Sequence, residues 1–404
     1  MNTNWKRNTY LMAFCVVCTS ASYTMLIPFL PIYLLDLGTP EADVPFWSSA
    51  VFSVTFFIAA IMAPVWGRIA DRYGRKKMAV RACIGLTLSY AIGGLVTSPE
   101  GLFGMRVVQG FANGFIAAVL AITAAIAPKD QLGVAIGTIQ TGQITGSVMG
   151  PLLGGVLAHL VGMRLSFFVA AGFLGLATVL VLRYLDAPPE PKHDTVTDAS
   201  QSGLAADFRY AWHNRVLLSM LILCAVVNMA NMVLQPVISL YVAQLQGTME
   251  NVVMSSGIVF SLGGIAGALS TNAWGKFGQT RGFFRAMSLA FLGGGICLCL
   301  QYFPTELTAF AVLQFAFGLM MAGTMPAINA VMVKVTPADF HGRVFGLTSS
   351  ANQTGAMLGP ILGGILSTAL GIRPIFLITG TALILLAGAI GMRYRDESRK
   401  SSER

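Results

Sequence analysis

The sequence has few charged residues, and this shortage excludes most water-soluble folds. Only 11% of the 404 residues are Asp, Glu, Lys or Arg, whereas a soluble globular domain has about 25%. The mean hydropathy is +0.70, and 55% of the residues are hydrophobic. A chain of this composition cannot hide its apolar side chains in one core, so we expect it to use a lipid bilayer as solvent.

Histidine and cysteine are also scarce, which removes most metal sites and catalytic sites from consideration. The 4 histidines are scattered, and neither a His-Glu-x-x-His motif nor a nucleophile elbow is present. The 6 cysteines lie in apolar segments, where a thiol behaves as a small hydrophobic group. We therefore expect no disulfide, metal or cofactor, and an intramembrane enzyme is disfavoured.

What the sequence has in abundance is long apolar segments. A helix of roughly 20 residues crosses a bilayer core about 30 Å thick, and segments close to or above that length recur along the whole chain. They lie at 10–35, 47–69, 79–97, 101–126, 133–159, 165–184, 216–243, 251–273, 286–303, 306–333, 343–369 and 374–393. The pattern predicts an all-α membrane protein with twelve transmembrane helices in two six-helix bundles.

A single long polar stretch separates the two sets of apolar segments. It contains Pro188-Pro189-Glu190-Pro191 and a run rich in Ser, Thr and Asp, a composition typical of a linker. The expected organisation is an N-terminal bundle, a linker, a C-terminal bundle and a tail, at residues 1–185, 186–215, 216–393 and 394–404.

The basic residues lie almost entirely on one side of this topology. If the N-terminus is cytoplasmic, that side receives the loop-two cluster with Arg81, the linker and the tail, and the opposite side keeps only Arg164 and Arg373. Cytoplasmic loops carry such an excess of Lys and Arg. We expect both termini to be cytoplasmic. The net charge of +9 then reflects topology, so we expect no nucleic-acid partner.

The two halves of the chain repeat each other. Trp66-Gly67 recurs as Trp274-Gly275, and Gly162-Met-Arg164 recurs as Gly371-Ile-Arg373, with an offset that changes by one residue beyond the fourth span. Parallel six-helix repeats are related by a pseudo-twofold axis along the membrane normal and enclose a cavity near mid-membrane. A transport pathway between the halves is the expected consequence.

Polar residues at helical spacing give candidate residues for the cavity. Polar faces of transmembrane helices avoid lipid and turn to neighbouring helices or water, and aromatic side chains would supply apolar walls. The stripes are Arg106, Gln109 and Asn113; Gln140, Gln143 and Ser147; and Asn228, Asn231 and Gln235, with Tyr23, Phe111, Phe115 and Tyr241 as aromatics. For each amide, the alternative is a hydrogen bond between helices.

Arg106 is an ionisable residue inside the fourth predicted span, where a charge is costly and indicates function. The carboxylate nearest in depth is Asp36, at the same end of the first span. A titrating Asp36 beside Arg106 would couple protonation to a rearrangement of helices. The alternative is that Asp36 is an exposed loop acid and that Arg106 snorkels or binds carbonyl groups.

The turn between the second and third spans reads Gly67-Arg-Ile-Ala-Asp71-Arg72-Tyr-Gly74-Arg75-Lys76-Lys77. It resembles the loop-two motif of the major facilitator superfamily. Its glycines permit a tight turn and close approach of helices. The resemblance implies a cytoplasmic latch made by Gly67, Asp71, Arg72, Gly74 and Arg75, and the alternative is a basic turn without a gating role. The second half has Gln279 in place of the acid, so the latch would be one-sided.

A glycine-proline pattern occurs at matching places in both halves. Gly146-Ser-Val-Met-Gly150-Pro151-Leu-Leu-Gly154-Gly155 in the fifth span is repeated as Gly355-Ala-Met-Leu-Gly359-Pro360-Ile-Leu-Gly363-Gly364 in the eleventh. Small residues at this spacing let helices approach closely, and proline bends a helix. The pattern resembles the motif that distinguishes exporters within the superfamily, and it assigns Gly150, Pro151, Gly359 and Pro360 to gating.

The resemblance covers nearly the whole chain and is to the twelve-span drug:proton antiporter branch of the superfamily, which includes bacterial multidrug-resistance exporters. It implies a monomer in the bacterial inner membrane that exports small amphipathic compounds by alternating access while protons flow inward. A cavity with amides and aromatics but almost no charge favours neutral or weakly charged amphipathic substrates. Two other functions stay open: a same-fold importer or facilitator for a metabolite, siderophore or lipid, and a receptor or scaffold that transports nothing.

Overall fold

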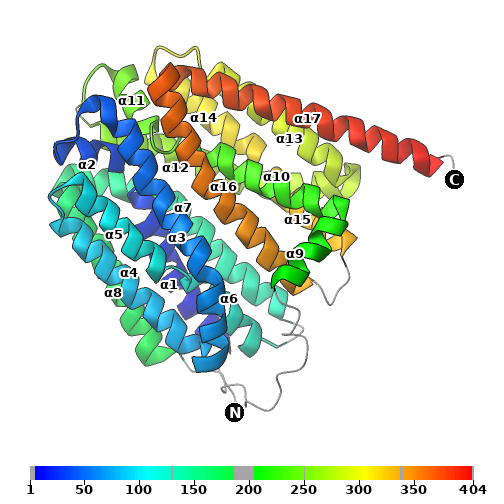
Figure 1. Cartoon of the computed structure of the whole chain (residues 1–404), viewed down its shortest axis with the longest axis horizontal. Coiled ribbons are helices and arrows are strands. Elements are labelled where there is room, and N and C mark those ends of the chain that lie inside the picture. Colours follow the sequence, from blue (N-terminus) through cyan, green and yellow to red (C-terminus); the bar gives the residue numbers. More distant parts are fainter. Residues whose placement is uncertain (1–4, 129–130, 186–203, 250, 337–340, 403–404) are drawn as a thin grey trace. The chain divides into compact units, whose positions relative to one another are not determined.

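The computed structural model describes the chain except for residues 1–4, 129–130, 186–203, 250, 337–340 and 403–404 (Figure 1). The described residues form α-helices and one short 3-10 helix, with no strand among them. The chain divides into two compact units. Unit 1 comprises Met1–Thr197 and Val253–Ile258, and unit 2 comprises Asp198–Val252 and Val259–Arg404.

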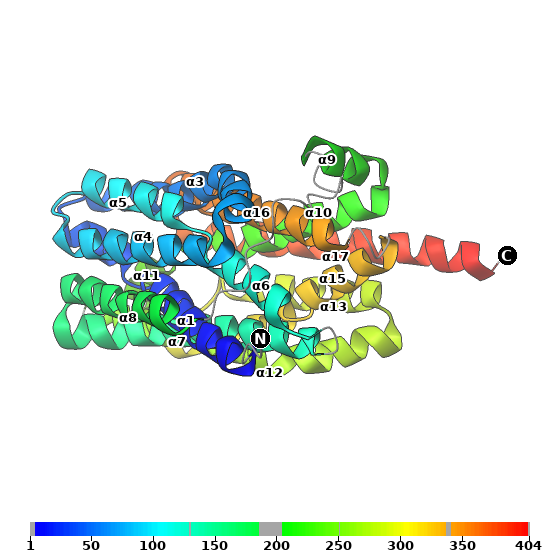
Figure 2. The same ribbon diagram turned by 90° about the horizontal axis from the view of Figure 1, so that it is seen from below.

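Unit 1 is an α-helical bundle in which α1 packs along α7, α4 along α8, and α3 along α5 (Figures 1 and 2). Its helices are α1 (Trp5–Met25), α2 (Leu30–Asp36), α3 (Val44–Tyr73), α4 (Arg75–Leu95), α5 (Pro99–Ala112), α6 (Phe115–Ile126), α7 (Leu132–Val161) and α8 (Met163–Tyr184), with the 3-10 helix η1 (Glu41–Asp43) before α3.

Unit 2 repeats this arrangement, with α10 packed along α16 and α13 along α17. Its helices are α9 (Leu204–His213), α10 (Arg215–Met232), α11 (Ile238–Gln246), α12 (Val252–Arg281), α13 (Phe283–Leu300), α14 (Leu307–Met321), α15 (Thr324–Val335), α16 (His341–Leu370) and α17 (Ile372–Ser402). Residues Val253–Ile258 of α12 belong to unit 1, and the rest of α12 belongs to unit 2. Helix α9 lies in the stretch that we expected to be a linker.

The helices are long and apolar enough for a polytopic membrane protein. Ten candidate spans occur among the described residues, and the pair α1 and α2, bent by 51°, gives an eleventh. Helix α16 corresponds to the remaining predicted span, but Ser349, Ser350, Asn352 and Gln353 make its middle more polar. The all-α membrane fold expected from the sequence is therefore present.

Four spans that we predicted as continuous helices are broken in the structure. In three of them the cause is local, because proline lacks the N–H that a helix needs and glycine adopts backbone angles that other residues avoid. Pro28 and Pro236 lie in two of the breaks, and Gly114 has a φ of +117° in a third. The breaks are at residues 26–29, 113–114, 233–237 and 322–323.

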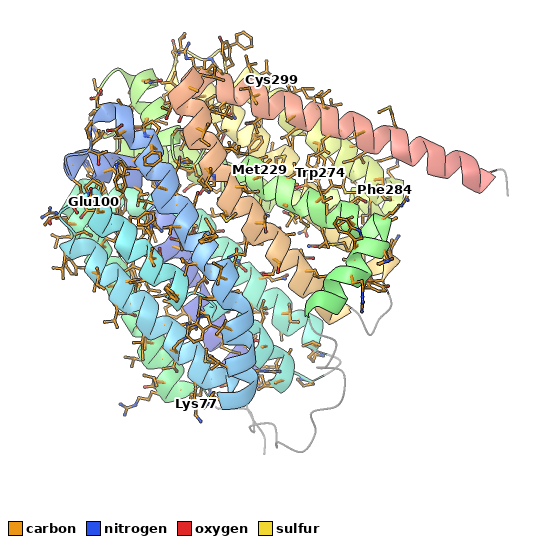
Figure 3. All side chains as sticks on the ribbon, viewed as in Figure 1. Lys77, Glu100, Met229, Trp274, Phe284 and Cys299 are labelled. Carbon is orange, nitrogen blue, oxygen red and sulfur yellow. The ribbon has the colours of Figure 1, made fainter. Side chains whose placement is uncertain are left out.

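The internal repeat of the sequence is also a repeat of contacts within each unit. The indole N–H of Trp66 donates to the carbonyl of Phe111 at 2.9 Å, and that of Trp274, labelled in Figure 3, donates to the carbonyl of Leu319 at 2.8 Å. The two turns after these helices are made by Gly74 and Gly282, with φ values of 98° and 99°. Equivalent residues therefore tie equivalent helices together.

Candidate functional site

The glycines of the fifth predicted span bring α7 into backbone contact with α1. A Cβ atom added at Gly146, Gly150 or Gly154 would come under 3.0 Å from atoms of α1, including the carbonyl oxygens of Val17 and Met25. Backbone atoms cannot move aside as a flexible side chain can. Only glycine allows this packing, so the motif has a defined structural role in unit 1.

The matching glycines of α16 do the same against α10 in unit 2. A Cβ atom added at Gly355 would collide with the carbonyl of Ala225, and one at Gly363 with the carbonyl of Val233. Pro151 and Pro360 lie inside the uninterrupted helices α7 and α16. The glycine-proline pattern thus builds one close helix pair in each unit.

The loop-two motif forms the turn between α3 and α4. Gly74 lies between α3 and α4 and has a φ of 98° and a ψ of 137°. Residues with a side chain rarely adopt this backbone conformation. A Cβ atom added at Gly67, in contrast, would have no neighbour within 4 Å. Among the described residues of unit 1, no close helix approach occurs at Gly67, and the backbone geometry that favours glycine in this turn is that of Gly74.

Two basic residues of the motif, Arg75 and Lys76, bind backbone carbonyl groups of other segments of unit 1. Arg75 Nη1 donates to the carbonyl of Ala121 in α6 at 2.9 Å, and Lys76 Nζ donates to the carbonyl of Leu185, just after α8, at 2.6 Å. Positive charges are favourable near the carbonyl ends of helices. The side chains of Asp71 and Arg72 lie outside the described part of the structure, so the latch stays a prediction.

The two glycines of this motif should respond differently to alanine. Gly74→Ala is expected to lower the melting temperature of the purified protein, since a residue forced into a disfavoured backbone region costs about 1–3 kcal/mol. Gly67→Ala is the matched control and should leave the melting temperature unchanged or slightly higher, because alanine favours helix. Equal losses in the two variants would show that the turn geometry is not what limits stability.

Arg81 is a functional candidate that the sequence analysis missed. We counted it with the cytoplasmic basic residues although it falls within the predicted span 79–97, and in the structure it lies inside the candidate span α4. Its guanidinium stacks on Trp66 at 3.8 Å and donates to the carbonyls of Phe111 and Asn113 at 2.8 and 2.9 Å. It therefore holds the broken end of α5. Its position four residues after Lys77, the last basic residue of the loop-two cluster, was the feature of the sequence that set it apart.

Arg106 lies on α5 in the interior of unit 1 and is 1% exposed. Its Nη1 atom donates to Gln109 Oε1, one helical turn away, at 2.8 Å. The guanidinium lies 5.4 Å from the ring of Phe52, a cation-π distance. Tyr23 and Tyr90 interact electrostatically with it. The structure therefore surrounds this charge with aromatic and amide groups.

Asp36 is separate from this cluster. Its side chain is exposed at the end of α2, and its electrostatic neighbour in the described structure is Tyr33. The Tyr33 hydroxyl donates to the carbonyls of Gly93 and Val96 at 3.3 and 3.4 Å, which links α2 to the end of α4. The structure thus does not bring Asp36 and Arg106 together.

The predicted cavity residues have different surroundings. Asn228 Nδ2 donates to Asn352 Oδ1 at 2.7 Å, which is the hydrogen bond between helices given above as the alternative. Asn113 lies at the break after α5, outside the expected helical stripe, and its Oδ1 accepts from the N–H of Gly114 at 2.6 Å. The exposed candidates are Phe111, Gln140, Gln143 and Asn231, the half-buried ones are Tyr23, Ser147 and Gln235, and the buried ones are Gln109, Phe115 and Tyr241.

Comparison with known proteins gives a consistent result over the whole chain. A family model described as Major Facilitator Superfamily matches residues 12–300 and 273–404. The uncharacterized MFS-type transporter YuxJ of Bacillus subtilis is 34% identical over 386 residues, 95% of this chain and 97% of YuxJ. The multidrug resistance protein MdtG of Serratia proteamaculans is 31% identical over 390 residues, 96% of this chain and 93% of MdtG.

A solved structure has the same fold. The crystal structure of a mutant of nucleoside transporter NupG superposes with a TM-score of 0.81, covering 96% of this chain and 99% of that chain. The sequences of the two chains are only 15% identical. This similarity therefore establishes the fold and carries no information on the substrate.

Proposed function

The chain belongs to the major facilitator superfamily, and we propose that it is a proton-driven exporter of small amphipathic compounds. Members of this family are transporters, so the chain is a multi-pass membrane transporter and not an enzyme. The proposal adds the direction of transport, the driving ion and the class of substrate. It places the chain as a monomer in the bacterial inner membrane with both termini in the cytoplasm.

One observation carries the export proposal. The glycine-proline pattern, which resembles the exporter motif, forms backbone contacts between α7 and α1 in unit 1, and its copy forms them between α16 and α10 in unit 2. Such seams let the backbones of neighbouring helices approach closely, with no side chain of the glycines between them. The printed name of MdtG, a multidrug resistance protein that is 31% identical, supports the same direction of transport.

For proton coupling we propose Asp36 as the group that binds and releases the driving proton, with Arg106 as a fixed positive charge in the same unit. The exposed Asp36 is within reach of solvent, and its neighbour Tyr33 is bonded to the end of α4. A change of charge at Asp36 would therefore alter the electrostatics at the α2–α4 contact. Asp36 is thus accessible to protons from solvent and is connected to α4 through Tyr33.

The remaining candidates take the roles that alternating access requires. We propose that the loop-two residues, with Asp71 as the acceptor, close the cytoplasmic side when the cavity faces outward. Three polar candidates are the first choices for contact with substrate: Gln140, Gln143 and Asn231. Their side chains are exposed and not buried between helices. Each assignment is open to single substitutions.

Transport in proteoliposomes under an imposed pH gradient tests the function directly. An exporter accumulates a fluorescent amphipathic dye on one side of the membrane, and it does so only as long as the pH gradient lasts. A facilitator equilibrates the dye without any gradient, and a receptor or scaffold moves none of it. Reversed accumulation, with dye following the protons, would identify an importer.

A latch at Asp71 predicts a kinetic rather than an affinity defect. Asp71→Asn keeps the size of the side chain but removes its charge, so it should slow turnover several-fold while leaving dye binding nearly unchanged. Steady-state transport and equilibrium binding of the same dye provide the two measurements. A loss of affinity with normal turnover would assign Asp71 to the substrate site instead.

A further inference from the structure

Arg106 carries a buried charge without a negative partner among the described residues. It is 1% exposed, and the groups that interact with it are Gln109, Phe52, Tyr23 and Tyr90. A positive charge inside a membrane protein is normally paired, because lipid and protein interior solvate it poorly. Aromatic faces and one amide oxygen meet only part of that need.

The hydrogen-bond donors that remain unused in this cluster all require an acceptor. Arg106 Nε and Nη2 are buried and have no hydrogen-bond partner among the described residues, and the buried Gln109 Nε2 has the Tyr90 hydroxyl as its neighbour. These atoms can donate but cannot accept, so another donor would not satisfy them. The buried Tyr23 hydroxyl also lacks a hydrogen-bond partner in the described part of the chain, and it can donate as well. Several donors next to one positive charge are the chemistry of an anion site.

Unit 2 shows that the fold at this position does not need a charge. The internal repeat places Gln314 of α14 where unit 1 has Arg106, and Asn231 and Phe317 where it has Tyr23 and Gln109. Gln314 Oε1 accepts from Gln301 Nε2 at 3.0 Å, so the amide is satisfied by the protein itself. The arginine is therefore a specific feature of unit 1.

We infer that the cluster of Arg106, Gln109 and Tyr23 binds a monovalent anionic group. Two alternative sources supply such an anionic group: a free inorganic anion such as chloride, or the carboxylate of a transported amphipathic compound. The second source rests on the proposed function, and it would specify weak organic acids within the neutral or weakly charged compounds that the sequence favoured.

Thermal unfolding of the purified full-length protein in detergent tests the first source. At constant ionic strength, replacing gluconate by chloride should raise the melting temperature in a saturable way. In Arg106→Gln, which copies the residue of unit 2, the apparent affinity should fall by about tenfold or more, the effect of losing a charged hydrogen bond. Arg183→Gln, which removes an exposed arginine of α8, should respond like the wild type.

A second variant keeps the test valid if Arg106→Gln does not fold. Gln109→Glu puts a carboxylate where the amide oxygen now lies 2.8 Å from Arg106 Nη1. This built-in anion should raise the melting temperature in gluconate and abolish the response to chloride. A Gln109→Glu protein that still responds to chloride like the wild type would overturn the inference.

The second source is tested with 1-naphthaleneacetate and its neutral analogue 1-naphthaleneacetamide. Stabilisation by the acid but not by the amide, lost in Gln109→Glu, would assign the site to the acidic group of a substrate. Stabilisation by chloride alone would assign it to a free anion. If neither the acid nor chloride stabilises the protein through Arg106, the site binds only water and the inference is wrong. No pH gradient is involved, so these results do not depend on proton-driven export.

Discussion

Asp36→Asn is expected to reduce dye accumulation in proteoliposomes to the level measured without a pH gradient. Asparagine has nearly the size of aspartate but cannot bind and release a proton, so the driving ion would lose its acceptor. Because Asp36 is exposed at the end of α2, the substitution should not disturb the packing of unit 1. Equilibrium binding of the dye should therefore be retained.

The nearby Asp43 provides the matched control. It is also exposed, lies in the short helix η1, and its side chain makes no cap hydrogen bond to α3. Asp43→Asn should transport like the wild type. If Asp36→Asn kept full gradient-driven accumulation, Asp36 would have no part in coupling. If it lost dye binding as well, its role would be in the substrate site.

Gly154→Ala should strongly reduce the amount of folded protein. The new Cβ atom would collide with the backbone of Met25 in α1, and a side-chain rotation cannot relieve that collision. Overpacking of this kind typically costs about 1–3 kcal/mol, and the cost is at the upper end where backbone must move. The melting temperature and the yield of monodisperse protein after size-exclusion chromatography are the measurements.

Two other variants define how specific this effect is. Gly137→Ala changes a glycine of the same helix at which an added Cβ would meet nothing within 4 Å, so it should be harmless. Gly363→Ala places the same collision in unit 2, against Val233, and should match Gly154→Ala. Equal stability of the Gly137 and Gly154 variants would mean that the seam between α1 and α7 is looser than the structure shows.

The sequence predicted the membrane class, the repeat and the family, but it missed local breaks in four spans. Apolar length is easily recognised because each span must cross the bilayer by itself. A break depends on a few residues such as Pro28 or Gly114, whose effect an average over a long segment conceals. Asn113 was placed in a polar stripe for this reason, whereas the break removes it from the helix.

The candidate site was predicted only in part, since partners come from distant parts of the chain. Arg106 was recognised as unusual, but its neighbours Phe52, Tyr23 and Tyr90 lie on α3, α1 and α4. The expected pairing with Asp36 rested on depth in the membrane, which does not fix position around the helix axis. Arg81 fell within the predicted span 79–97 but was counted with the cytoplasmic basic residues, because a charge near a span end is usually solvated.

The sequence by itself determined that this chain is a membrane-embedded helical transporter of duplicated design, because hydropathy and repetition are properties of consecutive residues. Only the tertiary structure decided which groups meet: that Gly154 touches α1, that Arg81 holds the end of α5, and that Arg106 is buried among donors. The reason is physical. A buried polar group is stabilised by atoms that reach it through space, and their identity depends on how the helices pack.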